Sequence, residues 1–134
     1  MKRFIGIDVS KAHLDMALVD PTGTLLQEIR IVNERQAIRK LLKQWSKEHS
    51  ANKERTLACL EPTGHYGYLL LEELARSGMS TWLAHPLDIK HSIGVTRGKS
   101  DQVDARRIAD YARRYQEKAR LSTATTLRMM TLKQ

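Results

Sequence analysis

Three short segments place acidic residues where a divalent metal ion could bind. They read GIDVSK (residues 6–11), EPTGHY (residues 61–66) and KSDQVDA (residues 99–105). Their acids are Asp8, Glu61, Asp101 and Asp104. Magnesium and manganese prefer hard oxygen ligands and keep water or phosphate in their remaining positions. Carboxylates that converge from separate elements of a basic chain predict metal-assisted chemistry on a phosphodiester backbone.

The positive charge of the chain is concentrated in its last third. The formal net charge is +8. Residues 1–84 carry 12 Lys and Arg against 10 Asp and Glu, whereas residues 85–134 carry 11 against 5. This excess indicates a polyanionic partner such as nucleic acid, although charge alone is equally compatible with a solvated basic surface.

Length and composition restrict the class of protein. A chain of 134 residues with 41% hydrophobic and 28% charged residues suits one globular domain. No apolar run approaches the roughly 20 residues of a membrane span, and the apolar run before Asp8 is too short for a signal peptide. The single cysteine, Cys59, lies in an apolar run and is expected to be a buried small hydrophobe in a cytoplasmic protein. The five histidines and one cysteine show no zinc-ligand spacing.

The hydrophobic pattern predicts the order β-β-β-α-β-α-β-α. Strands are expected at 3–9, 14–19, 24–32, 55–60 and 79–84, and helices from the N-cap Asn33 to about residue 48, at 65–77 and at 101–116. A short helix near 87–92, in a segment where the pattern breaks, is not counted in this order. Three strands with short links form an antiparallel meander, and the later alternation gives a mixed α/β sheet with helices on both faces. This order resembles an RNase H-like domain. In that fold, Asp8 on the central first strand and Glu61 at the end of the fourth lie side by side.

Each acid also has a plainer interpretation. Asp101 and Asp104 could stabilise a helix start capped by Ser100. At helical spacing, however, both share the apolar face that should pack on the sheet, which favours metal ligation. Asp8 could be an ordinary polar residue at a strand end, and Glu61 a surface acid held extended by Pro62. Asp15, by contrast, lies in an alternating strand and is expected to face solvent.

Basic residues in two regions are candidates for nucleic-acid contacts. Lys11 follows Asp8, and Arg97 and Lys99 flank a glycine, which suits contact with backbone phosphates. A helical ridge of arginines could bind nucleic acid or simply be solvated: Arg106, Arg107, Arg113 and Arg114. His65 could touch substrate or sit on the surface at a helix start.

Over residues 3–115 the three segments together resemble the N-terminal domain of the DEDD transposases of the insertion-sequence one-ten family, to which the Piv invertases are related. The resemblance implies a fold like that of the Holliday-junction resolvase RuvC. It also implies that Asp8, Glu61, Asp101 and Asp104 form a catalytic tetrad that binds Mg²⁺ or Mn²⁺. The partners it implies are element and target DNA and a structured non-coding guide RNA.

The family resemblance also sets an expectation for domain organisation. Members are more than twice as long and carry a second domain with a serine nucleophile. Residues 1–116 are therefore expected to be the catalytic domain and residues 117–134 the start of a linker. We expect this chain not to recombine DNA alone, and the full-length protein to be a homo-oligomer. The alternatives are a stand-alone RuvC-like nuclease and a non-catalytic DNA- or RNA-binding regulatory fragment.

Overall fold

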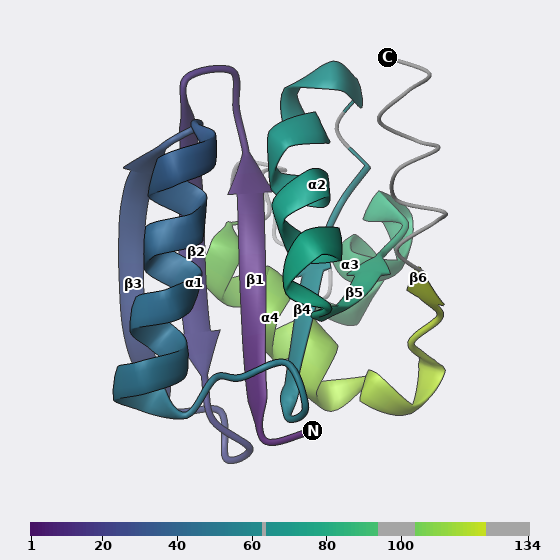
Figure 1. Ribbon diagram of the computed structural model, residues 1–134. Helices are drawn as coiled ribbons and strands as arrows, with labels where there is room; N and C mark the ends of the chain where they lie inside the picture. The colour runs from purple at the N-terminus through teal and green to yellow at the C-terminus, as the bar shows by residue number, and fades with distance from the viewer. Residues whose placement is uncertain (63, 94–103, 123–134) are drawn as a thin grey trace.

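A computed structural model describes residues 1–62, 64–93 and 104–122 of the chain (Figure 1). The elements in chain order are β1 (Arg3–Val9), β2 (His13–Val19), β3 (Leu25–Val32), α1 (Arg35–His49), β4 (Thr56–Leu60), the 3-10 helix η1 (Gly64–Gly67), α2 (Tyr68–Ser77), β5 (Ser80–Leu83), α3 (Pro86–Ile93), α4 (Ala105–Arg114), the 3-10 helix η2 (Gln116–Lys118) and β6 (Leu121–Ser122).

The strands form one mixed sheet in the order β3-β2-β1-β4-β5-β6. β1, β2 and β3 pair antiparallel as a meander, whereas β1 pairs parallel with β4 and β4 parallel with β5. The predicted meander and mixed sheet are therefore confirmed. β6, which the sequence pattern did not predict, pairs antiparallel with β5 beyond residue 116.

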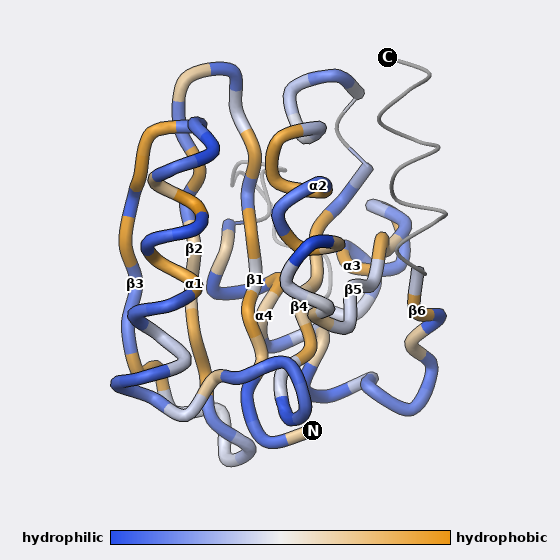
Figure 2. The backbone as a smooth tube through the Cα atoms, viewed as in Figure 1, coloured by the Kyte–Doolittle hydropathy of each residue, from blue (hydrophilic) through white to orange (hydrophobic). Residues whose placement is uncertain are grey.

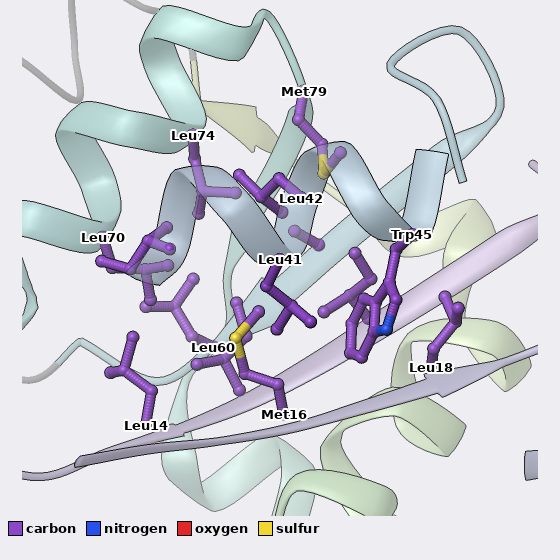
Figure 3. Packing of buried hydrophobic residues seen from close by; sticks show 14 of the residues in the cluster. Leu14, Met16, Leu18, Leu41, Leu42, Trp45, Leu60, Leu70, Leu74 and Met79 are labelled. Carbon is purple, nitrogen blue, oxygen red and sulfur yellow. The ribbon is translucent and has the colours of Figure 1, made fainter. Parts of the chain in front are cut away.

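Helices α1 and α2 cover one face of the sheet. Alternate residues of the strands point to this face, because successive side chains in a strand point to opposite sides. Figure 3 shows Leu41 and Trp45 of α1 packed above Met16 and Leu60 of the sheet. The hydrophobic stretches of β1 and β4 are visible as orange segments in Figure 2. This layer is the larger of the two apolar cores.

Helix α4 covers the opposite face and crosses behind β1 in Figure 1. Its buried residues Ile108 and Ala112 belong to a second apolar cluster with Phe4 and Leu57. Where its first turn meets the sheet, one row of adjacent strand residues is small: Ala17 on β2, Gly6 on β1 and Cys59 on β4. A β-carbon at Gly6 would lie 2.1 Å from the carbonyl oxygen of Ala105, so only glycine allows α4 this close.

Two predicted helix starts are wrong. The N-cap residue of α1 is Glu34, which is extended and makes no side-chain capping hydrogen bond, and not Asn33. Helix α4 begins at Ala105, with Asp104 as its N-cap, and not at residue 101. Local propensity located neither N-cap, because it does not include the tertiary contacts that fix where a helix begins.

None of the helices in the described part of the chain has the length and apolar character to cross a membrane.

Candidate metal and nucleic-acid site

Asp8 and Glu61 lie beside each other at the ends of two parallel strands. The β1–β4 ladder ends with the pair Ile7 and Leu60, and Asp8 and Glu61 are the residues that follow them in the chain. Ile7 and Leu60 belong to the core under α1 and α2. Asp8 and Glu61 therefore project to the opposite face, which α4 covers. The predicted adjacency of these two acids agrees with this register.

The charge state of Glu61 reflects this neighbour. Partial burial raises the pKa of Glu61 above its usual value, the negative charge of Asp8 raises that pKa further, and Lys90 on α3 opposes both effects. Repulsion between two carboxylates is relieved by a cation placed between them. Because no local pattern pointed to Lys90, sequence reasoning missed its place near the site.

Asp104 lies at the start of the helix that crosses the same face. Its Oδ1 accepts a hydrogen bond of 2.9 Å from the backbone N–H of Arg107, and its side chain is exposed. The expectation that Asp104 shares the buried stripe of α4 is therefore wrong, since it precedes the helix and caps it. Because the capping bond uses Oδ1, the second carboxylate oxygen could still bind a cation. Asp101, Arg97, Lys99 and Ser100 lie outside the described residues.

A charged row crosses the sheet just past the small residues under α4. We define it as Arg30, Asp15, Asp8 and Glu61, on β3, β2, β1 and the end of β4. Asp15 pairs with Asp8 on one side and with Arg30 on the other in the strand registers. Arg30 holds Asp15 through two hydrogen bonds, from Nε to Oδ1 at 2.8 Å and from Nη2 to Oδ2 at 3.2 Å. The sequence prediction treated Asp15 only as a solvent-facing residue and missed Arg30.

The loops after Asp8 and Glu61 are joined by one side chain. Asn33 Nδ2 donates to the carbonyl oxygen of Ser10 at 3.0 Å and to that of Tyr66 at 2.8 Å. These two bonds use the amide N–H groups, whereas Oδ1, the atom that would accept a capping hydrogen bond, is buried with no hydrogen-bond partner among the described residues. Next to Tyr66, His65 packs its ring against the Tyr66 ring with centroids 4.5 Å apart and lies exposed.

The predicted arginine ridge is present on the outer side of α4, but its four arginines differ in the contacts they make. Arg106 Nε lies 3.9 Å from Glu28 Oε2, a weak ion pair, and Arg107 is exposed. Arg113 is tied to Asp110 by two hydrogen bonds of 3.0 and 2.7 Å. Arg114 lies over the ring of Tyr115, with 5.2 Å from its Cζ to the ring centroid. Lys11, in the turn after β1, is exposed.

The candidate ligands are of the chemical type that a hard cation prefers. Asp8, Glu61 and Asp104 offer only carboxylate oxygens, the ligands that Mg²⁺ and Mn²⁺ prefer. Within the residues that the structure describes, no three His, Cys, Asp or Glu side chains are grouped closely enough to hold a metal ion. Asp8 and Glu61 are the two predicted ligands that the strand register brings side by side.

Cys59 is confirmed as a buried small hydrophobe. It lies two residues before Glu61 and is fully buried in the cluster under α4. Burial raises the pKa of its thiol to about 12, with a further contribution from the charge of Glu61. The thiol is therefore protonated at neutral pH and is a poor metal ligand.

Comparison with known proteins places this site in context. The model of the DEDD transposase family of IS110, described as transposase, matches residues 5–134. A Streptomyces coelicolor protein assigned as the transposase of the mini-circle IS117 is 34% identical over 113 residues, covering 82% of this chain and 27% of the relative. An uncharacterized 44.8 kDa protein of insertion element IS116 from Streptomyces clavuligerus is 28% identical over 134 residues, covering 96% of this chain and 32% of the relative. The chain thus spans about a third or less of these relatives.

Among solved structures, the fold is similar to that of Thermus thermophilus RuvC in complex with a Holliday junction substrate. The TM-score is 0.63 at 13% sequence identity, over 91% of this chain and all of the RuvC chain. At this identity the likeness shows the fold alone. It confirms the RNase H-like, RuvC-like α/β architecture that the order of the elements predicted.

Proposed function

Because the chain belongs to the DEDD transposase family of IS110, we propose that it is the metal-binding catalytic domain of a transposase that acts on insertion-sequence DNA. One observation carries the proposal: Asp8 and Glu61 lie side by side at the ends of parallel strands, and burial together with the charge of Asp8 raises the pKa of Glu61. Two carboxylates so placed can bind a divalent cation. In a family of enzymes that act on DNA, such a cation would serve catalysis.

The residues proposed to hold Mg²⁺ or Mn²⁺ are Asp8, Glu61, Asp101 and Asp104. When bound, the metal would neutralise charge on the phosphate that reacts. The protein would supply the fixed orientation of Asp8 and Glu61 through the β1–β4 pairing. Asn33, which joins the loops that follow them, would limit their relative motion.

Nucleic acid would approach over the face of α4. Lys11 and the exposed Arg106 and Arg107 are proposed to contact backbone phosphates, with Arg97 and Lys99 from the segment before α4. Arg113 and Arg114 are proposed as weaker contacts, because their guanidinium groups already bind Asp110 and Tyr115. Such contacts make affinity fall with salt in proportion to the phosphates neutralised.

We further propose that the full-length protein is cytoplasmic, assembles as a homo-oligomer and is directed by a structured non-coding RNA. Recombination would need a C-terminal domain with a serine nucleophile, and residues 117–134 would lead to it. The 134-residue chain is then expected to bind metal and nucleic acid without completing strand exchange.

The test is a titration of the chain with Mn²⁺ and with Mg²⁺ by calorimetry. We expect binding in the wild type and a loss of about tenfold or more in affinity in Asp8→Asn and in Glu61→Gln, since each removes a ligand charge. Glu54→Gln, which removes an exposed acid near the opposite end of β4, is the matched control and should bind as the wild type does.

Two results would redirect the proposal. Cleavage of a four-way DNA junction by the chain alone, dependent on Asp8 and Glu61, would favour a self-sufficient nuclease. Salt-sensitive nucleic-acid binding with no metal binding by the wild type would favour a regulatory fragment.

A further inference from the structure

Arg30 holds a position in the charged row that the proposed metal site does not explain. Register places Arg30 opposite Asp15 and Asp15 opposite Asp8, and all three lie on the face of the sheet that α4 packs against. The neighbouring row, with Glu28 and Gly6, lies against the first turn of α4, where Arg106 approaches Glu28. Arg30 therefore lies in the same row as Asp8, one row beyond the strand residues that contact the first turn of α4.

The ion pair with Asp15 fixes the orientation of this guanidinium and leaves part of it available. The pair uses Nε and Nη2 of Arg30, side-on to both oxygens of Asp15. An arginine has five N–H donors, and these two bonds use two of them. The side chain of Arg30 is 64% exposed and that of Asp15 is 36% exposed, so the guanidinium of Arg30 is largely accessible to solvent.

Fold stability does not account for the pair. Exposed ion pairs contribute little to stability because solvent screens the charges and ordering long side chains costs entropy. Arg30 nevertheless stays protonated. Hydrogen bonding to Asp15 raises the pKa of the guanidinium, and the charges of Asp15 and Asp8 raise it further. A permanently charged, oriented arginine beside a phosphodiester site is suited to bidentate phosphate recognition.

We propose that Arg30 binds a backbone phosphate of the nucleic-acid strand whose reactive phosphate lies at Asp8 and Glu61, and that Asp15 is the positioning residue for Arg30. This inference rests on the proposed function of the same site. Arg30 on β3 is two β-strands away from Asp8 on β1, about 10 Å at the usual spacing of β-strands. A nucleic-acid strand that follows the row would present roughly three phosphates over that distance, at one per ~3.4 Å of helix axis.

The test uses the 134-residue chain and fluorescence anisotropy with labelled 30-nucleotide probes: duplex DNA, single-stranded DNA and single-stranded RNA. We expect Arg30→Gln to weaken binding about threefold or more at low salt. It should also reduce the slope of log affinity against log salt by about one phosphate contact. Lys40→Gln, which removes one exposed positive charge from α1 on the opposite face, is the matched control and should change neither quantity. The probe with the largest loss identifies which nucleic acid crosses the row.

Asp15→Asn separates a positioned guanidinium from a mere charge. Removing an acid would tighten nucleic-acid binding if charge alone mattered, whereas it weakens binding if Asp15 orients Arg30. Arg30→Lys keeps the charge without the fork and should restore only part of the affinity. Thermal unfolding of each variant, followed by circular dichroism, reports whether the fold is intact.

The outcomes distinguish this inference from the function on which it rests. Binding by the wild type with equal losses in Arg30→Gln and Lys40→Gln overturns the phosphate contact while leaving the metal site in place. Tighter binding by Asp15→Asn, or loss of Mn²⁺ affinity in that variant, overturns the positioning role. No binding of any probe by the wild type overturns both the inference and the proposed nucleic-acid function.

Discussion

Gly6 and Ala105 meet backbone to backbone between strand β1 and helix α4. A β-carbon at residue 6 would lie 2.1 Å from the Ala105 carbonyl oxygen and 2.3 Å from the backbone nitrogen of Ala109. Gly6 is two residues before Asp8 on the same face, and Ala105 directly follows Asp104. This contact therefore links the strand that carries one proposed ligand to the helix start that carries another.

Gly6→Ala should lower the free energy of unfolding by about 1–3 kcal/mol, the usual cost of overpacking, because the atoms in the way are backbone and cannot rotate aside. Urea unfolding measures this loss, and Mn²⁺ titration should show weaker binding as α4 is displaced. Gly64→Ala is the comparison: its positive φ of 63° also disfavours alanine, but nothing lies within 4 Å of the new β-carbon. Equal metal affinity in Gly6→Ala and wild type would contradict the proposed link.

Substitutions at Asp104 should separate its capping bond from metal ligation. Serine is as good an N-cap as aspartate, so Asp104→Ser should keep the stability of the fold, whereas Asp104→Ala should lose about 0.5–2 kcal/mol. Both variants should lose Mn²⁺ affinity, because neither has a carboxylate. Calorimetry and urea unfolding of the same two proteins give the answer. Wild-type metal affinity in Asp104→Ser would reduce the role of Asp104 to capping.

Acid should weaken the junction between α1 and α2 through Glu73. Glu73 is buried, and its oxygens accept hydrogen bonds of 2.9 and 3.0 Å from Arg39. Hydrogen bonding to Arg39 lowers the pKa of Glu73 below its usual value of 4.5. A carboxylate with a depressed folded-state pKa adds stability above its unfolded-state pKa, and that stability is lost as the pH falls through the folded-state value.

The stability advantage of wild type over Glu73→Gln should accordingly be full at pH 7 and shrink as the pH falls below about 4.5. Urea unfolding at a series of pH values measures it. In Arg39→Gln, which keeps Glu73 but removes its main partner, the same pH dependence should be smaller. An advantage that stays constant down to pH 3 would be inconsistent with the lowered pKa.

Asn33→Ala should loosen both loops that follow the proposed ligands. It removes the hydrogen bonds to the carbonyl oxygens of Ser10 and Tyr66, each of which contributes about 1 kcal/mol. Hydrogen exchange should become faster in residues 10–13 and 64–67 while β4 keeps its protection. Asn33→Asp, which lacks the N–H donors, should behave like the alanine variant. Unchanged exchange in both loops would show that the tether is dispensable.

The sequence sufficed for the features that depend on local pattern and strand order. Alternation and helical spacing predicted the mixed sheet, and that topology placed Asp8 beside Glu61. The features it did not predict depend on register between distant segments. The Asp15–Arg30 pair requires the β2–β3 register, which includes an irregularity between Leu18 and Val19. β6 is only two residues long and carries no periodicity to detect.

Helix starts were missed for a related reason. Asn33 has ideal capping chemistry, yet its amide binds loops that are 23 and 33 residues away in the chain. Asp104 was assigned to the buried face because the helix was expected to begin earlier. Propensity ranks the candidates for a cap, but the tertiary contacts of each side chain decide between them.

The buried thiol of Cys59 provides a natural probe of the motion of α4. It is the single cysteine of the sequence, it lies in the cluster beneath α4, and its pKa of about 12 keeps it unreactive while covered. An alkylating reagent can therefore modify the protein only when that helix lifts away or the whole domain unfolds. The labelling rate then measures how often the α4 layer opens, with no need for an introduced probe. Slower labelling with metal or DNA present would mean that ligands close this layer onto the sheet.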